Sequence, residues 1–228
     1  MGKSTENKKE RKTVFTNAYE GVKKIHKAEI LALIASILLL IGSIISATGI
    51  EVGENTSSGE GLLIGGGLLV IAAAVLMIIG AIMNIVGVNR ASRDESAFKN
   101  ALIALLFGIA ANILVSVFSN NTTISSIGKT LANVTEILAS YYICTGIINL
   151  ADRLSNSEVS AQGKKVRSIL MGIWVASAVL NVLTALFGTN ETMQAVIGII
   201  AIVGGIISIV AYFLYIGLLG KAKNMLAR

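Results

Sequence analysis

The sequence predicts an all-α integral membrane protein with six transmembrane helices arranged as three hairpins. The first observation is composition: 54% of the 228 residues are hydrophobic and only 14% are charged, against about 25% charged residues in ordinary globular chains. So few charges cannot cover the surface of a soluble fold. The second is a series of six long apolar stretches, since a helix needs about 20 apolar residues to cross a bilayer. The third is the placement of the basic residues, which lie outside these stretches.

The six apolar stretches are the predicted spans. They are continuous apolar runs and lack the strict alternation of a membrane β-barrel, so they predict helices. The first run is too long for the apolar region of a signal peptide and follows a mostly polar segment, so it is expected to be retained. Only one of the six contains a charged residue, Glu136. The predicted spans are residues 30–50, 62–88, 100–118, 131–151, 169–187 and 193–220.

The basic residues predict the orientation of the chain. Of the 19 lysines and arginines, 18 lie in residues 1–29, 89–99, 152–168 and 221–228, and the remaining one is Lys129. Basic residues favour the cytoplasmic side of a membrane. Both termini and the two longer connections are therefore predicted to be cytoplasmic. We expect a multipass protein of a cell membrane, of the bacterial or archaeal cytoplasmic type.

Two pairs of segments indicate an internal repeat of hairpins in parallel orientation. Residues 112–123 align with residues 181–192, with five identities in twelve positions. Residues 141–151 resemble residues 212–222. The first hairpin matches weakly, and chance similarity between apolar sequences is the alternative interpretation.

The N-terminal segment, residues 1–27, is a basic cytoplasmic tail in which a helix over about 13–27 is predicted. One face of that helix is apolar, and lysines lie among its polar positions. Such a helix is expected to lie on the inner leaflet and to attract anionic lipid, although a plain basic tail is the alternative. The six-helix domain would then cover residues 28–222, followed by a short tail, residues 223–228. The apolar face is formed by Val14, Phe15, Ala18, Val22 and Ile25.

Capping boxes predict where two helices begin. Ser92-x-x-Glu95 and Ser155-x-x-Glu158 match the pattern in which a serine and a glutamate three residues later satisfy the first free amides of a helix. The third and fifth helices are therefore predicted to begin before their apolar spans.

Small and polar residues within the spans predict helix packing, because association in lipid relies on close approach and on hydrogen bonds between helices. Small residues recur every four positions around the start of the first predicted span, at Ala28, Ala32 and Ser36. Packing inside the chain is one interpretation; contact with a second copy or with a membrane partner is the other. The predicted packing residues are Gly61, Gly65, Ala201, Gly205, Asn112 and Asn181.

Glu136 is the predicted functional residue. A charged side chain in a membrane core costs on the order of 3 kcal/mol, and such residues mark substrate or ion pathways. Lys129, Asn133, Glu136 and Ser140 are spaced to share one helical face, which should contact protein or water. Two structural alternatives remain: Glu136 lies at the outer interface, or it is a hydrogen-bonded packing residue.

The composition also excludes several function classes. A single histidine, His26, and a single cysteine, Cys144, cannot build a haem, zinc or iron–sulfur site, so no metal or other cofactor is expected. No intramembrane nucleophile has a base nearby in the predicted topology, so the chain is not expected to be an enzyme. The net charge of +6 is assigned to the membrane surface, and no nucleic-acid partner is expected.

Two functions remain. The repeat, the Glu136 face and the absence of a large soluble domain favour movement of a small solute or cation across the membrane. The alternative is a non-catalytic accessory, assembly or substrate-binding subunit of a larger membrane complex.

Overall fold

The computed structural model describes residues 14–52, 57–120, 122–187 and 191–227. Over these residues the chain is all-helical. Five of the helices, all except α5, are long and apolar enough to cross a membrane, and α5 contains the apolar run 169–187. This is the architecture of a polytopic membrane protein. The helices are α1 (Thr16–Val52), α2 (Ser57–Ala91), α3 (Ser96–Val117), α4 (Thr122–Arg153), α5 (Ser157–Phe187) and α6 (Glu191–Leu226).

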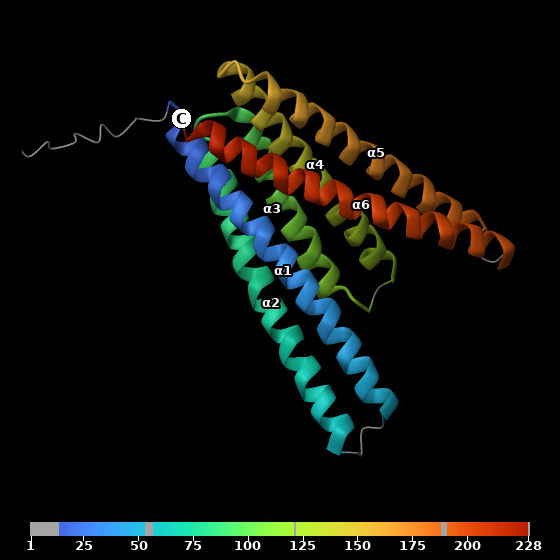
Figure 1. The fold of residues 1–228 in the computed structure, drawn as a ribbon. Coiled ribbons are helices and arrows are strands. Elements are labelled where there is room, and N and C mark those ends of the chain that lie inside the picture. Colours follow the sequence, from blue (N-terminus) through green and yellow to red (C-terminus); the bar gives the residue numbers. More distant parts are fainter. Residues whose placement is uncertain (1–13, 53–56, 121, 188–190, 228) are drawn as a thin grey trace, which may run out of the picture.

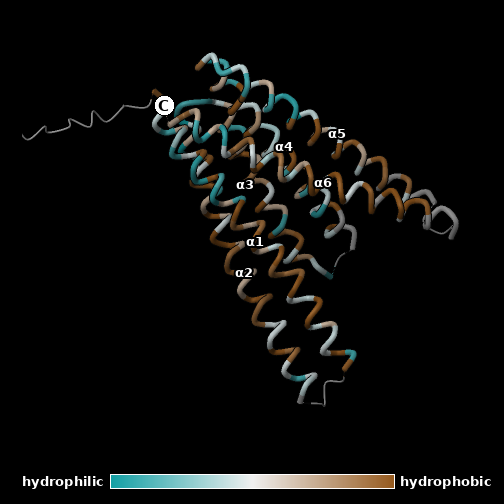
Figure 2. The backbone as a smooth tube through the Cα atoms, in the orientation of Figure 1, coloured by the Kyte–Doolittle hydropathy of each residue, from teal (hydrophilic) through white to brown (hydrophobic). Residues whose placement is uncertain are grey.

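Consecutive helices pair into the hairpins α1–α2, α3–α4 and α5–α6, and contacts of α2 with α3, α4 with α5 and α1 with α6 close them into a ring. The hairpins meet at one end and diverge toward their tips (Figure 1). We call the end where α1, α3 and α5 begin the closed end, and the end with the hairpin tips the open end. Hydrophilic residues gather at the closed end, and the helices become more apolar away from it (Figure 2).

The core of the molecule lies at the closed end. Phe98, Ile147, Leu150 and Leu218 come from α3, α4 and α6, and each is fully buried in one hydrophobic cluster. Gly146 admits the ring of Phe98, because a Cβ at this glycine would lie 2.5 Å from a ring carbon. Large side chains therefore join the hairpins at this end.

The N-terminal segment differs from the sequence-based expectation. Helix α1 runs without a break from Thr16, and the apolar residues Ala18, Val22 and Ile25 are fully buried in the core. The reason is close packing on α2: a Cβ at Gly21 would lie 2.5 Å from the carbonyl oxygen of Gly87. The part of the predicted apolar face formed by Ala18, Val22 and Ile25 is therefore covered by protein, whereas Val14 at its start is 80% exposed, and contact with lipid there stays a prediction. Residues 1–13 lie outside the described residues.

The helix starts also differ from the predicted capping boxes. Helix α3 begins at Ser96, and its N-cap is Glu95, whose carboxylate accepts a hydrogen bond from the Ala97 amide at 3.4 Å. Helix α5 begins at Ser157, and the side chain of Asn156 accepts from the Val159 amide at 3.1 Å. Both helices do begin before their apolar spans.

The glycines that bring α1 and α2 together are not the predicted ones. A Cβ at Gly66 would lie 2.7 Å from the carbonyl oxygen of Gly42, so this pair sets the distance between the helices. Gly61, Gly65 and Gly205 would each admit a Cβ with no atom within 4 Å among the described residues. Adjacent residues differ by about 100° around a helix, so Gly65 and Gly66 face different directions, and contact of Gly61, Gly65 or Gly205 with a second copy or a membrane partner stays a prediction.

Candidate functional site

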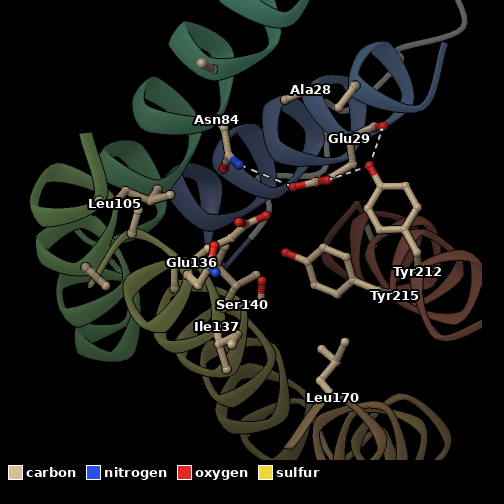
Figure 3. Close-up of a pocket in the computed structure, with 18 of the residues that line it drawn as sticks. Ala28, Glu29, Asn84, Leu105, Glu136, Ile137, Ser140, Leu170, Tyr212 and Tyr215 are labelled. Atoms are coloured by element: carbon tan, nitrogen blue, oxygen red, sulfur yellow. Dashed lines mark hydrogen bonds between the residues drawn. The ribbon is translucent and has the colours of Figure 1, made fainter. Parts of the chain in front are cut away.

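A cavity of about 580 Å³ lies between the hairpins and is lined by residues from all six helices. Its volume falls within the range of about 300–1,000 Å³ that is typical of small-molecule sites. Figure 3 shows that the side chains of Glu29, Asn84, Glu136, Tyr212 and Tyr215 bring carboxylate, amide and hydroxyl groups to it.

Glu29 of α1 is hydrogen-bonded at the cavity by side chains of two other helices. Its Oε1 accepts a hydrogen bond from Asn84 Nδ2 of α2 at 3.2 Å. The Tyr212 hydroxyl of α6 lies 2.9 Å from Oε2 and 3.0 Å from the backbone carbonyl oxygen of Glu29, and it can donate to either. These bonds tie helices of two hairpins together through one carboxylate (Figure 3).

Glu136 of α4 lines the same cavity, together with Asn133 and Ser140. Its side chain is exposed to the cavity, and no hydrogen bond or ion pair to it is found among the described residues. The two glutamates thus differ: Glu29 is hydrogen-bonded by neighbouring side chains, whereas the Glu136 carboxylate is available to bind a ligand.

The cavity is acidic. Two carboxylates line it, and none of its described lining residues is a lysine, arginine or histidine. A carboxyl group in a low-dielectric site either takes up a proton or stays ionised beside a positive charge, and a bound cation stabilises the ionised form. The cavity therefore suits a cationic ligand.

Two buried polar atoms at the cavity have no hydrogen-bond partner among the described residues. They are the hydroxyl oxygen of Tyr215 and the side-chain oxygen of Asn84. Tyr215 is 4% exposed, and its hydroxyl points toward Ser140 and Glu136 (Figure 3). Buried polar groups are usually hydrogen-bonded, so these atoms are positions where a ligand can supply the missing partner.

The structure brings together part of the predicted site. Asn133, Glu136 and Ser140 line the cavity, and so does Asn112, whose amide donates to the carbonyl oxygen of Gly108 in its own helix at 3.1 Å. Lys129 is exposed and does not line the cavity. The side chains of Asn181 and Ala201 lie outside the described residues.

Sequence reasoning missed Glu29, Tyr212 and Tyr215. The predicted first span began at residue 30, one residue after Glu29, so this carboxylate was placed outside the membrane. A signal was present, because Ala18, Val22, Ile25 and Glu29 follow a 4-3-4 spacing and share one helical face. Glu29 continues the buried face of α1.

A second polar cluster lies at the closed end. Glu95 is buried, and its carboxylate contacts Arg153 Nη2 of α4 at 2.7 Å and accepts from Asn149 Nδ2 at 2.9 Å. The adjacent Asp94 accepts from the Ala18 amide at 2.8 Å and caps α1. This cluster fixes α1, α3 and α4 to one connection and is structural.

Comparisons with known proteins add no function. The chain matches no protein-family model, no curated protein and no solved structure. Among the described residues, no group of three or more histidine, cysteine, aspartate or glutamate side chains is placed to hold a metal ion. The functional argument therefore rests on the cavity.

Proposed function

We propose that this protein moves a small, positively charged solute or cation across a cell membrane and binds it in the central cavity. The observation that carries the proposal is the pair of carboxylates, Glu29 and Glu136, which face one cavity that has no basic residue among its described lining. An ionised carboxylate within the membrane is costly unless a positive charge accompanies it. A cationic solute supplies that charge.

The shape of the bundle supports an opening on one side only. Residues such as Phe98 and Leu150 pack the closed end, whereas the hairpins diverge toward the open end. The basic residues predict that the closed end faces the cytoplasm. In that orientation the cavity is reached from outside, and release to the inside requires the hairpins to rock about the closed end, as alternating access does in repeat-built transporters.

The alternative is a substrate-binding subunit of a larger membrane complex. The packed closed end favours this alternative, since a chain that only delivers a solute to a partner needs no passage of its own. The two functions differ in whether the purified chain alone supports flux.

The test is uptake into liposomes that contain only the purified chain. Radiolabelled Rb⁺ and a radiolabelled alkylamine are the two probes. We expect uptake of at least one of them in the wild type and a loss of at least about tenfold in Glu136→Gln, because the charge-assisted contact is removed. Glu136→Gln should fold normally, since Glu136 has no partner among the described residues. Glu158→Gln is the matched control, since Glu158 is an exposed glutamate outside the cavity. Equal uptake by Glu136→Gln and wild type would contradict the proposal, and binding without flux in the wild type would favour the accessory subunit.

A further inference from the structure

The lining of the cavity has a small polar region and a larger apolar one. Glu136, Ser140 and the Tyr215 hydroxyl line the cavity and point into the same part of it in the view of Figure 3. The remaining wall includes bulky apolar and aromatic side chains from three helices: Leu105, Ile137, Leu170, Ile173 and Trp174. A ligand that matches this wall has one polar head and an apolar body.

An inorganic cation does not match it. Hard cations such as Ca²⁺ take six to eight oxygen ligands at about 2.3–2.6 Å. Here one of the two carboxylates, Glu29, already accepts hydrogen bonds from Asn84 and Tyr212, and the cavity of about 580 Å³ is far larger than an ion. An ion in this space would keep its water shell and leave the apolar wall unused.

The free polar groups match an ammonium head. An ammonium carries several N–H donors, and Glu136 offers a carboxylate for a charge-assisted hydrogen bond. The buried Tyr215 hydroxyl has no partner among the described residues and can accept a second N–H. We infer that the solute is a protonated organic amine whose ammonium binds between Glu136 and Tyr215 and whose apolar body packs against Leu170 and Trp174. The inference rests on the proposed function, in which the cavity is the solute site, and it names the class of solute.

Trp174 provides the readout. It is the one tryptophan in the sequence and it lines the cavity, so its fluorescence reports occupancy of this site. Three probes that do not absorb with tryptophan separate the alternatives: cyclohexylmethylamine, the uncharged cyclohexylmethanol, and Rb⁺. With the purified full chain in lipid nanodiscs, we expect a saturable change with the amine, none with Rb⁺, and at least about tenfold weaker binding of the alcohol, because it lacks the charge.

Two variants test whether the ammonium binds at Glu136 and Tyr215. Glu136→Gln should weaken amine binding by at least about tenfold. Tyr215→Phe should weaken it by about tenfold, because it deletes one hydrogen bond from the ammonium and keeps the ring. The matched controls are Glu158→Gln and Tyr19→Phe, which change the same groups at the closed end outside the cavity lining. Both controls should bind the amine as wild type does. If Glu136→Gln does not elute as a single folded species from a size-exclusion column, binding of the amine by Tyr215→Phe alone tests the inference.

The result that overturns the inference is equal binding of amine and alcohol, or a Trp174 response to Rb⁺ that displaces the amine. Amine binding that survives both variants unchanged would also overturn it. These results differ from failure of the proposed function: a chain that binds the amine with the expected dependence on Glu136 but supports no flux in liposomes keeps this site and loses the transport role.

Discussion

The closed end and the open end of the bundle are built from the same six helices but are held together in different ways. At the closed end, side chains such as Phe98, Leu150 and Leu218 interlock across hairpins and are fully buried. Toward the open end, α1 and α2 meet through small residues such as Gly42 and Gly66, and the hairpins separate from one another (Figure 1). The cavity lies between these two regions.

The difference follows from the solvent that each end is expected to meet. Burial of apolar groups stabilises a fold only where the alternative is water, and the basic residues predict that the closed end reaches the aqueous phase. In lipid, an exposed isoleucine is already in an apolar medium, so hairpins gain little by closing. Ile64, Ile71 and Ile202 are accordingly more than 60% exposed in the structure. A bundle can therefore be rigid at one end and open at the other without loss of stability.

The largest expected effect tests the closed end. Phe98→Ala removes a fully buried ring that fills the space left by Gly146, and we expect a loss of about 3–5 kcal/mol in unfolding free energy. Phe107→Ala is the control on the same helix, because Phe107 is 63% exposed and faces away from the core. Unfolding of the purified protein in mixed micelles measures both. Equal losses would mean that the two faces of α3 are not distinct.

The next largest effect tests the hairpin contact toward the open end. Gly66→Ala places a Cβ 2.7 Å from the Gly42 carbonyl oxygen and must push α1 and α2 apart, at a cost of about 1–3 kcal/mol. Gly65→Ala should leave stability unchanged, because a Cβ there meets nothing within 4 Å among the described residues. The same unfolding measurement compares these neighbours, and an effect at Gly65 that equals the effect at Gly66 would show a different register or a second copy on that face.

A smaller effect is expected at the polar cluster of the closed end. Arg153→Met leaves the buried Glu95 carboxylate with hydrogen bonds from Asn149 and the Ala97 amide only. The Arg153 side chain is 52% exposed but the Glu95 side chain only 2%, so water can replace only part of the contact, and we expect a loss of about 1–2 kcal/mol. Thermal unfolding at neutral pH measures it. A loss as large as that of Phe98→Ala would mean that the ion pair, and not apolar packing, holds the closed end.

The sequence predicted the helices well because hydropathy is a local property. Each predicted span lies within a helix of the structure, apart from the end of the third at Phe118, which caps α3. The helices extend well beyond the spans at the closed end, where the chain is amphipathic. There the apolar stripe of α1 fits two environments equally well, a lipid surface or a protein core, and only the position of α2 decides between them.

Only part of the candidate site could be predicted, because local sequence does not show which distant residues come into contact. Glu136 is conspicuous within its own helix, whereas Glu29 gains its meaning from Tyr212, which lies 183 positions away in the sequence. Glycine register is a third case, since Gly65 and Gly66 are equivalent by composition and differ only in which one faces α1. Contacts between specific residues of distant helices cannot be predicted from local composition.

The smallest expected effect concerns the exposed contact between α5 and α6 at the closed end. Lys221 Nζ donates a hydrogen bond to Glu158 at 2.7 Å, and this bond, with the positive charge of Lys221, lowers the pKa of the Glu158 carboxyl. A lowered pKa in the folded state means that the contact stabilises the fold above the ordinary glutamate pKa and is lost as the pH falls through the lowered value. Both side chains are at least half exposed, so water and salt screen the pair. We therefore expect Lys221→Met to lower the Tm slightly at neutral pH, less than Arg153→Met does, and to match wild type in acid, once the pH lies below the lowered pKa of Glu158. Lys164→Met, an exposed lysine on α5, controls for the change in net charge. A Tm difference for Lys221→Met that persists in acid would assign the effect to packing of the lysine stem against α5.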